Sequence, residues 1–169
     1  MNASACPAQA APGSAVPALR LAAMQAGHLD AVLAIEQRSH GHPWTRGHFL
    51  DTLAAGHHAQ CLLADDTLLG YLVAMPGYRE AHLLNLTIAP EHRRQGFARL
   101  LLTALAAWAR TQQAEALWLE VRASNTAAQQ LYARQGFARV GLRKHYYPAG
   151  RTGREDAVLM RLDLEAPAA

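Results

Sequence analysis

Residues 83–105 read LLNLTIAPEHRRQGFARLLLTAL, which joins an apolar run to a helical pattern through a basic turn. The first part predicts a β-strand that stops at Pro90, because proline cannot donate a hydrogen bond to a sheet ladder. The part after the turn predicts a helix that continues to about Gln113. Its apolar residues are spaced by four, four and three, as one buried helical stripe requires. They are Phe97, Leu101, Leu105 and Trp108.

The turn itself, RRQGFA at 93–98, stands at the start of this helix. A helix N-terminus presents unpaired N–H groups and partial positive charge, so a pyrophosphate can take several donors there. Gly96 would let such a ligand approach the backbone, and Ala98 keeps a nearby position small. Charge-assisted hydrogen bonds could come from Arg93, Arg94 and Arg99. Taken alone, the turn fits a solvated basic loop equally well. No G-x-G-x-x-G follows a strand here, and no G-x-x-x-x-G-K-S/T occurs, which excludes those phosphate motifs.

The rest of the chain alternates short apolar runs with helical patterns. Strands are predicted at 19–24, 59–66, 68–75, 116–121, 137–147 and 157–164. Helices are predicted at 26–40, 42–56 and 125–136. A turn at 65–67 predicts a hairpin, Asn125 is expected to cap the last helix, and Gly136 is expected to follow its end. These patterns predict a mixed α/β (α+β) domain with about seven strands and four helices.

Composition predicts a single globular domain. The chain has 169 residues, of which 51% are hydrophobic and 17% are charged, a balance that is typical of a folded protein. The domain is expected at 19–164, between flexible tails at 1–18 and 165–169. The net charge of +3 permits an anionic ligand without requiring nucleic acid.

Localisation is expected to be cytoplasmic. The first eighteen residues lack the basic and apolar regions of a signal peptide. No apolar run approaches the ~20 residues of a membrane span, so no membrane contact is expected. One of the two cysteines, Cys6, lies in the tail, and a disulfide framework is therefore not expected.

Three segments, taken in order, resemble the GNAT N-acetyltransferases, and within them most closely the ribosomal-protein-alanine N-acetyltransferases (RimI type). The segments are 83–105, 117–137 and 143–160, and the resemblance extends over roughly 19–164. The family's R/Q-x-x-G-x-G/A motif corresponds to Arg93, Gly96 and Ala98. Ala98 replaces the second glycine of the commonest pattern. Thr87 stands where a small apolar residue is usual, and no role is assigned to it.

The resemblance implies a GNAT-like sheet that is splayed between the strands holding Ile88 and Glu120. Acetyl-CoA, the cosubstrate, would enter from one side and the amine from the other. Its pantetheine would pair like an added strand with the backbone of Leu86, Thr87 and Ile88, where an N–H would also hold the thioester oxygen. The resemblance further implies that the pyrophosphate lies over Arg94, Gln95, Gly96, Phe97, Ala98 and Arg99. It also implies a contact between Asn125 and the CoA arm, which can coexist with helix capping.

Two residues are candidate catalysts. Glu120 alternates with apolar residues in its strand, so the pattern alone also fits an ordinary polar face. The resemblance implies that it is the general base, acting through water. Tyr132 fits a core position of the last helix, and the resemblance implies that it is the general acid for the CoA thiolate.

The amine side is expected to be flanked by the loops 40–45 and 146–156. Trp44 and Tyr146 are candidates to pack around a peptide N-terminus. Three acidic residues could attract a basic peptide: Glu36, Glu155 and Asp156. No metal is expected, because the histidine pairs have no carboxylate or cysteine at ligand spacing. These pairs are His40 with His42 and His57 with His58.

The expected function is acetylation of the N-terminal α-amine, that of alanine, of a small-subunit ribosomal protein, with acetyl-CoA as donor. The partners would be that peptide and acetyl-CoA, without direct nucleic-acid binding. One alternative is acetylation of lysine or of small-molecule amines. Another is a non-catalytic acetyl-CoA-binding or ribosome-associated module, whose basic charge would serve RNA contact.

Overall fold

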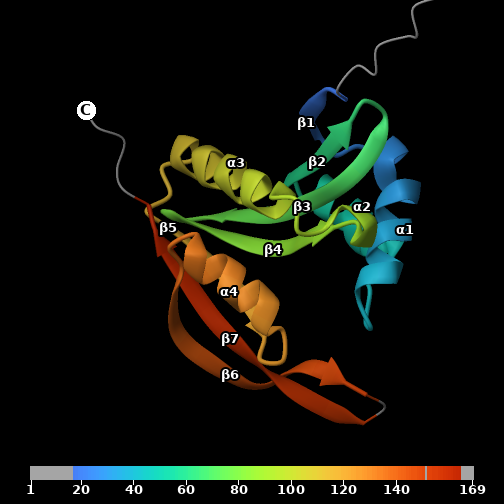
Figure 1. The fold of residues 1–169 in the computed structure, drawn as a ribbon. Coiled ribbons are helices and arrows are strands. Elements are labelled where there is room, and N and C mark those ends of the chain that lie inside the picture. The colour runs from blue at the N-terminus through green and yellow to red at the C-terminus, as the bar shows by residue number, and fades with distance from the viewer. Residues whose placement is uncertain (1–16, 151, 165–169) are drawn as a thin grey trace, which may run out of the picture.

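A computed structural model describes residues 17–150 and 152–164. The expected tails at 1–18 and 165–169 therefore lie almost wholly outside the described residues. Seven strands form one sheet in the order β1-β2-β3-β4-β5-β7-β6 (Figure 1). The strands are β1 (Leu19–Ala23), β2 (His58–Ala64), β3 (Thr67–Gly77), β4 (Glu80–Ile88), β5 (Ala116–Arg122), β6 (Ala138–Ala149) and β7 (Gly153–Asp163). The helices are α1 (Leu29–Ser39), α2 (Arg46–Ala54), α3 (Phe97–Thr111) and α4 (Thr126–Arg134), with short 3-10 turns η1 (Ala26–His28) and η2 (Pro90–His92).

The sheet is mixed, as predicted. β4 and β5 are parallel because α3 crosses over between them, and the other neighbours are antiparallel. The parallel pairing is short: Glu80–Leu83 lies opposite Ala116–Leu119 and no further residues pair. The two strands separate beyond this point, and the splay expected between the strands of Ile88 and Glu120 is thus confirmed.

Each face of the sheet carries its own hydrophobic core. α3 and α4 cover one face, where Leu101 and Leu105 of α3 are fully buried against β3, β4 and β5. α1 and α2 cover the opposite face over β2 and β3, where Phe49 and Tyr71 are fully buried and pack edge to face. The helices leave the opposite face of β5–β7–β6 uncovered (Figure 1). The residues of the candidate site lie on this face.

The second helix begins later than the predicted 42–56. It starts at Arg46, because Thr45 is extended and forms a capping box with His48. The Thr45 hydroxyl accepts from the His48 N–H at 3.4 Å, and the Thr45 N–H donates to His48 Nδ1 at 3.0 Å. Trp44 consequently lies in the loop before the helix.

The helix that follows the turn at 93–98 is α3, and it begins where the sequence predicts. Gly96 has φ +87° and immediately precedes α3, a conformation that few residues other than glycine adopt. The predicted caps of α4 are also confirmed. The Asn125 side chain accepts from the Ala128 N–H at 3.1 Å, and Gly136 follows the helix with φ +91°.

Cys61 is buried on β2 and forms no disulfide with any residue that the structure describes. Burial raises the pKa of its thiol to about 12. Cys6 falls outside the described residues. Within the described part of the chain, no helix is both long and apolar enough to cross a membrane.

Candidate active site

The end of β4 has a free edge. Its pairing with β3 shifts at Leu84, since Val73 lies opposite Asn85 while Ala74 lies opposite Leu83. Pairing with β5 stops at Leu83. Among the described residues, the segment 84–88 therefore has a strand neighbour on the β3 side alone, and its other edge is free to receive an extended ligand. Leu86, Thr87 and Ile88 all lie in this segment.

The turn that follows β4 presents a second set of free donors. Arg94 and Gly96 have positive φ values of 63° and 87°. Within the part of the chain that the structure describes, no side chain caps the N-terminus of α3, so the N–H groups of its first turn are available to an anion. A Cβ built on Gly96 would meet no atom within 4 Å, which leaves space for a ligand over the turn. Arg94 and Arg99 are exposed, and their side chains form no ion pair within the described residues.

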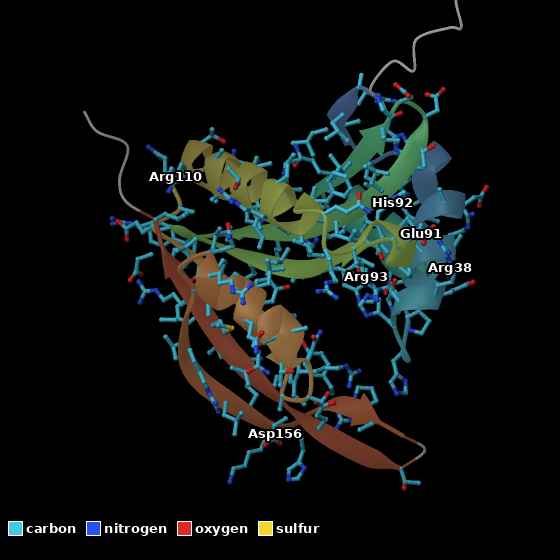
Figure 2. The ribbon with its side chains drawn as sticks, in the orientation of Figure 1. Arg38, Glu91, His92, Arg93, Arg110 and Asp156 are labelled. Carbon is cyan, nitrogen blue, oxygen red and sulfur yellow. The ribbon has the colours of Figure 1, made fainter. Side chains whose placement is uncertain are left out.

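The Arg93 side chain, which was expected to contact an anion, bonds to groups of the protein. Its Nε donates to the Ile88 carbonyl at 3.2 Å, and its Nη2 donates to Ser39 Oγ at 3.0 Å. Close by, Arg38 forms an ion pair with Glu91 at 3.1 Å (Figure 2). These bonds fasten the turn to α1, so Arg93 holds the turn in place.

A pocket of about 590 Å³ opens on the uncovered face of β5–β7–β6. Trp44 and Tyr146 both line it. Trp44 lies in the expected loop, whereas most of the segment expected as a loop at 146–156 belongs to β6 and β7, and Tyr146 lies on β6. The lining is completed by Glu80, His82, Leu83, Leu84, Trp118, Leu119, Glu120, Arg143, Tyr147 and Leu159.

Glu120 faces this pocket and is held from several sides. Its Oε1 forms an ion pair with Arg143 Nη1 at 2.9 Å. Tyr147 donates its hydroxyl to the Glu120 carbonyl at 3.0 Å. The side-chain hydrogen bond to Glu120 raises the pKa of Tyr146, and burial raises the pKa of Tyr147 to about 12. The carboxylate is thus oriented while remaining partly exposed, as proton transfer requires.

Tyr132 approaches β5 from the other face. It is buried on α4 and packs edge to face on Phe137 with ring centroids 5.7 Å apart. Burial, and to a smaller extent the charge of Tyr147, raise the pKa of Tyr132, so its phenol keeps its proton at neutral pH. The Glu120 side chain, on β5, and the Tyr132 side chain, on α4, therefore lie on opposite faces of the sheet.

The three acidic residues expected to attract a basic peptide all form contacts within the fold. Glu155 accepts from the Ser124 N–H at 2.6 Å and from Arg122 Nη1 at 3.2 Å. The pKa of the Glu155 carboxyl is lowered, and the hydrogen bond from Ser124 is the largest cause. Asp156 accepts from the His145 N–H at 2.8 Å. Glu36 is buried in a network of donors.

The sequence did not single out Arg143, Tyr147 or the His82–Glu80 pair as pocket residues. His82 Nε2 lies 2.9 Å from Glu80 Oε1. These four residues come close to Glu120 because of the register in which β4, β5, β7 and β6 pair. No local sequence pattern predicts that register. Asn125 lies away from the pocket lining, at the start of α4. The described residues contain no group of three or more His, Cys, Asp or Glu that could hold a metal.

Comparisons with known proteins agree on one family. The model of the acetyltransferase (GNAT) family matches residues 29–137. A Haemophilus ducreyi protein named ribosomal protein bS18-alanine N-acetyltransferase is 39% identical over 135 residues, which cover 80% of this chain and 93% of that protein. The Escherichia coli K12 protein of the same name is 34% identical over 144 residues, covering 85% of this chain and 97% of that protein.

Solved structures show the same fold. The crystal structure of the ribosomal-protein-S18-alanine N-acetyltransferase from Escherichia coli superimposes with a TM-score of 0.81 at 33% identity, covering 90% of this chain and 97% of that chain. Ard1 from Thermoplasma volcanium superimposes with a TM-score of 0.77 at 22% identity, covering 86% of this chain and 97% of that chain, which supports the fold alone.

Proposed function

The chain belongs to the acetyltransferase (GNAT) family, and we propose that it transfers the acetyl group of acetyl-CoA to the N-terminal alanine of ribosomal protein bS18. The observation that carries this proposal is the pocket in which Glu120, Trp44 and Tyr146 meet at the splay of the sheet. The relatives named above are called bS18-alanine N-acetyltransferases and match over most of their length. A ribosomal-protein substrate would place the reaction in the cytoplasm.

The free edge of β4 and the turn before α3 fit acetyl-CoA. The backbone of Leu86, Thr87 and Ile88 would pair with an extended amide-containing arm. The uncapped N–H groups of α3 would receive the pyrophosphate, assisted by two exposed arginines. The residues proposed at the pyrophosphate are Arg94, Gln95, Gly96, Phe97, Ala98 and Arg99, with Asn125 proposed at the CoA arm.

Glu120 and Tyr132 would divide the proton transfers. Acetyl-CoA, when bound, supplies a thioester whose acetyl group passes to the amine. An N-terminal ammonium must first lose a proton, and we assign its removal to Glu120, acting through a water molecule. The departing thiolate needs a proton, and we assign its delivery to the buried Tyr132 phenol, whose raised pKa keeps it protonated.

An α-amine acceptor is tested with two peptides built on one bS18 N-terminal sequence. One has a free N-terminal alanine and blocked lysines, and the other has a blocked N-terminus and a free lysine. An α-ammonium has a pKa of about 8 and lysine about 10.4, so at neutral pH or below the uncharged fraction of lysine is roughly 250-fold smaller. We expect the first peptide to be acetylated at least about 100-fold faster, as measured by mass spectrometry. Equal rates would instead favour acetylation of lysine or small amines, and modification of neither peptide would favour a non-catalytic module.

The pyrophosphate site is tested by Gly96→Glu. A carboxylate about 5 Å from a phosphate at an effective dielectric of about 20 costs about 3 kcal/mol, or about 100-fold in affinity. We therefore expect the Kd for acetyl-CoA, measured by calorimetry, to rise about 100-fold. Gly96→Lys is the matched control, because it imposes the same backbone strain with the opposite charge, and its Kd should rise far less. Equal losses in both folded variants would contradict an anion site at this turn.

A further inference from the structure

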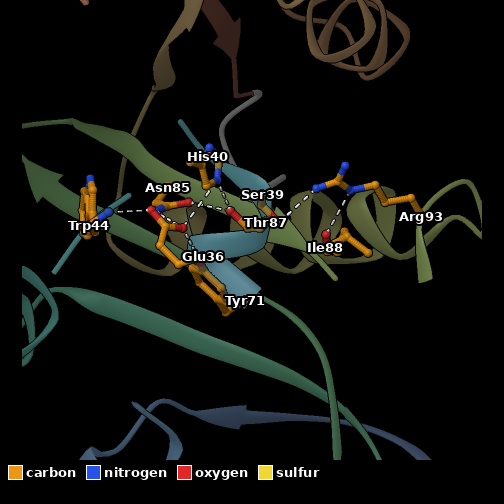
Figure 3. Close-up of polar contacts among 9 residues, drawn as sticks. All are labelled: Glu36, Ser39, His40, Trp44, Tyr71, Asn85, Thr87, Ile88 and Arg93. Carbon is orange, nitrogen blue, oxygen red and sulfur yellow. Dashed lines mark hydrogen bonds and ion pairs between the residues drawn. The ribbon is translucent and has the colours of Figure 1, made fainter. Parts of the chain in front are cut away.

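Trp44 lines one side of the pocket, and this side is called the Trp44 wall. A buried carboxylate lies behind it and takes no part in the chemistry proposed above. Glu36, on α1, is only 1% exposed. Donors from other segments converge on its two oxygens (Figure 3). The Trp44 N–H donates to Oε1 at 2.8 Å, and the Tyr71 hydroxyl donates to Oε2. The Asn85 amide nitrogen donates to Oε1 at 3.4 Å and to Oε2 at 3.3 Å. His40 Nε2 lies 3.4 Å from Oε2.

The same network includes Thr87, one of the two residues at which the sequence departs from the common family pattern. Thr87 is buried on β4 and donates its hydroxyl to Asn85 Oδ1 at 2.9 Å. Its oxygen lies 2.8 Å from His40 Nε2. The network thereby connects α1 and the Trp44 loop to β3 and to the free-edged segment of β4 (Figure 3).

A carboxylate is required at the centre of this network. A buried charge is tolerated only where donors satisfy it, and here each of the surrounding groups can donate. The side chain of a glutamine has one acceptor oxygen and an NH₂ group, so it would place donors against donors. Glu36 is therefore matched to its partners by hydrogen-bond polarity as well as by size.

The Trp44 backbone depends on this carboxylate for its position. The Trp44 loop is short and lies between α1 and α2. Its indole packs on Phe49, with ring centroids 5.3 Å apart, and lines the pocket. The backbone N–H of Trp44 donates to Glu36. The position of the Glu36 carboxylate therefore determines where the Trp44 backbone, and with it the indole, lies.

We propose that Glu36 is a positioning residue that fixes the Trp44 wall relative to β4 and so limits the size of the first acceptor residue. The role in acceptor choice rests on the proposed function. The positioning of Trp44 does not, because it follows from contacts that need no substrate.

Positioning is tested first without substrates, by hydrogen exchange at the Trp44 amide. Because this N–H donates to a charged group, Glu36→Gln is expected to speed its exchange by about 10-fold or more. Val32→Ala is the matched control, since Val32 lies one turn earlier on α1 and is fully buried. It should lower Tm while leaving Trp44 exchange unchanged. Equal acceleration in both variants would reduce Glu36 to a general contributor to stability.

Acceptor choice is tested with peptides that start with alanine or with leucine. Glu36→Gln is expected to raise the KM for the alanine peptide by about 10-fold, with kcat and the KM for acetyl-CoA changed by less than about threefold. The preference for alanine over leucine should fall in the same variant. Trp44→Ala should reproduce both changes, and the double variant should be no worse than Trp44→Ala, because both substitutions remove one wall.

Additive effects of the two substitutions, or an unchanged preference in Glu36→Gln, would overturn the role in acceptor choice. If the wild-type protein acetylates neither peptide, the proposed function fails instead. The exchange experiment still decides whether Glu36 positions Trp44.

Discussion

Replacing Glu120 by glutamine is expected to lower kcat for the alanine peptide by about 10²–10⁴-fold, the range for losing one positioned base. The amide keeps the shape of the side chain but cannot accept a proton at neutral pH. It also loses the ion pair with Arg143, so Tm is measured alongside turnover. The affinity for acetyl-CoA should stay near the wild-type value, because Glu120 lies outside the free edge of β4 and the turn before α3.

Glu80→Gln is the control for this result. Glu80 lines the same pocket and pairs with His82 at 2.9 Å, so the substitution removes an equal charge without removing the proposed base. Its loss of kcat should be less than about 10-fold. Near wild-type turnover in Glu120→Gln, or equal losses in both variants, would remove Glu120 from the role of base.

The second large effect is expected for Tyr132→Phe. Phenylalanine fits the same buried site and keeps the packing on Phe137, so only the hydroxyl is lost. Without its proton the thiolate is a poorer leaving group, and kcat should fall by about 10²–10⁴-fold with acetyl-CoA affinity retained. Burial raises the pKa of Tyr132. The wild-type rate should therefore show no fall below pH ~10 from ionisation of this tyrosine.

Tyr147→Phe serves as the control, because it also removes a tyrosine hydroxyl, the one that donates to the Glu120 carbonyl from the pocket side. Its effect on kcat should be clearly smaller than that of Tyr132→Phe. Turnover of Tyr132→Phe within threefold of wild type, measured in single-turnover experiments, would show that the thiolate takes its proton from another source.

Local patterns in the sequence were sufficient to predict most helices and strands. Apolar spacing predicted α3 and its buried stripe, and the capping residues Asn125 and Gly136 predicted the ends of α4. These features depend on neighbours within a few residues, which a sequence displays directly. The start of α2 was predicted too early, because the capping box of Thr45 and His48 begins the helix at Arg46.

The resemblance also led to the correct family and to the splayed sheet, and its assignments at Glu120 and Tyr132 stay predictions until the variants are measured. By itself, the sequence determined that a basic, glycine-containing turn follows a strand and begins a helix. It could not show that Arg93 turns back to Ile88 and Ser39, since the choice of partner depends on where α1 packs.

The surroundings of the Glu36 and Glu120 carboxylates depend on the tertiary structure alone. Glu36 and Glu120 both appear in the sequence as single acidic residues, each 84 positions from the other along the chain. Packing buries Glu36 among donors from the segment 40–44, β3 and β4 and leaves Glu120 facing a pocket. The physical reason is that burial and hydrogen-bond partners come from segments distant in sequence, and these set whether a carboxylate holds structure or remains accessible for proton transfer.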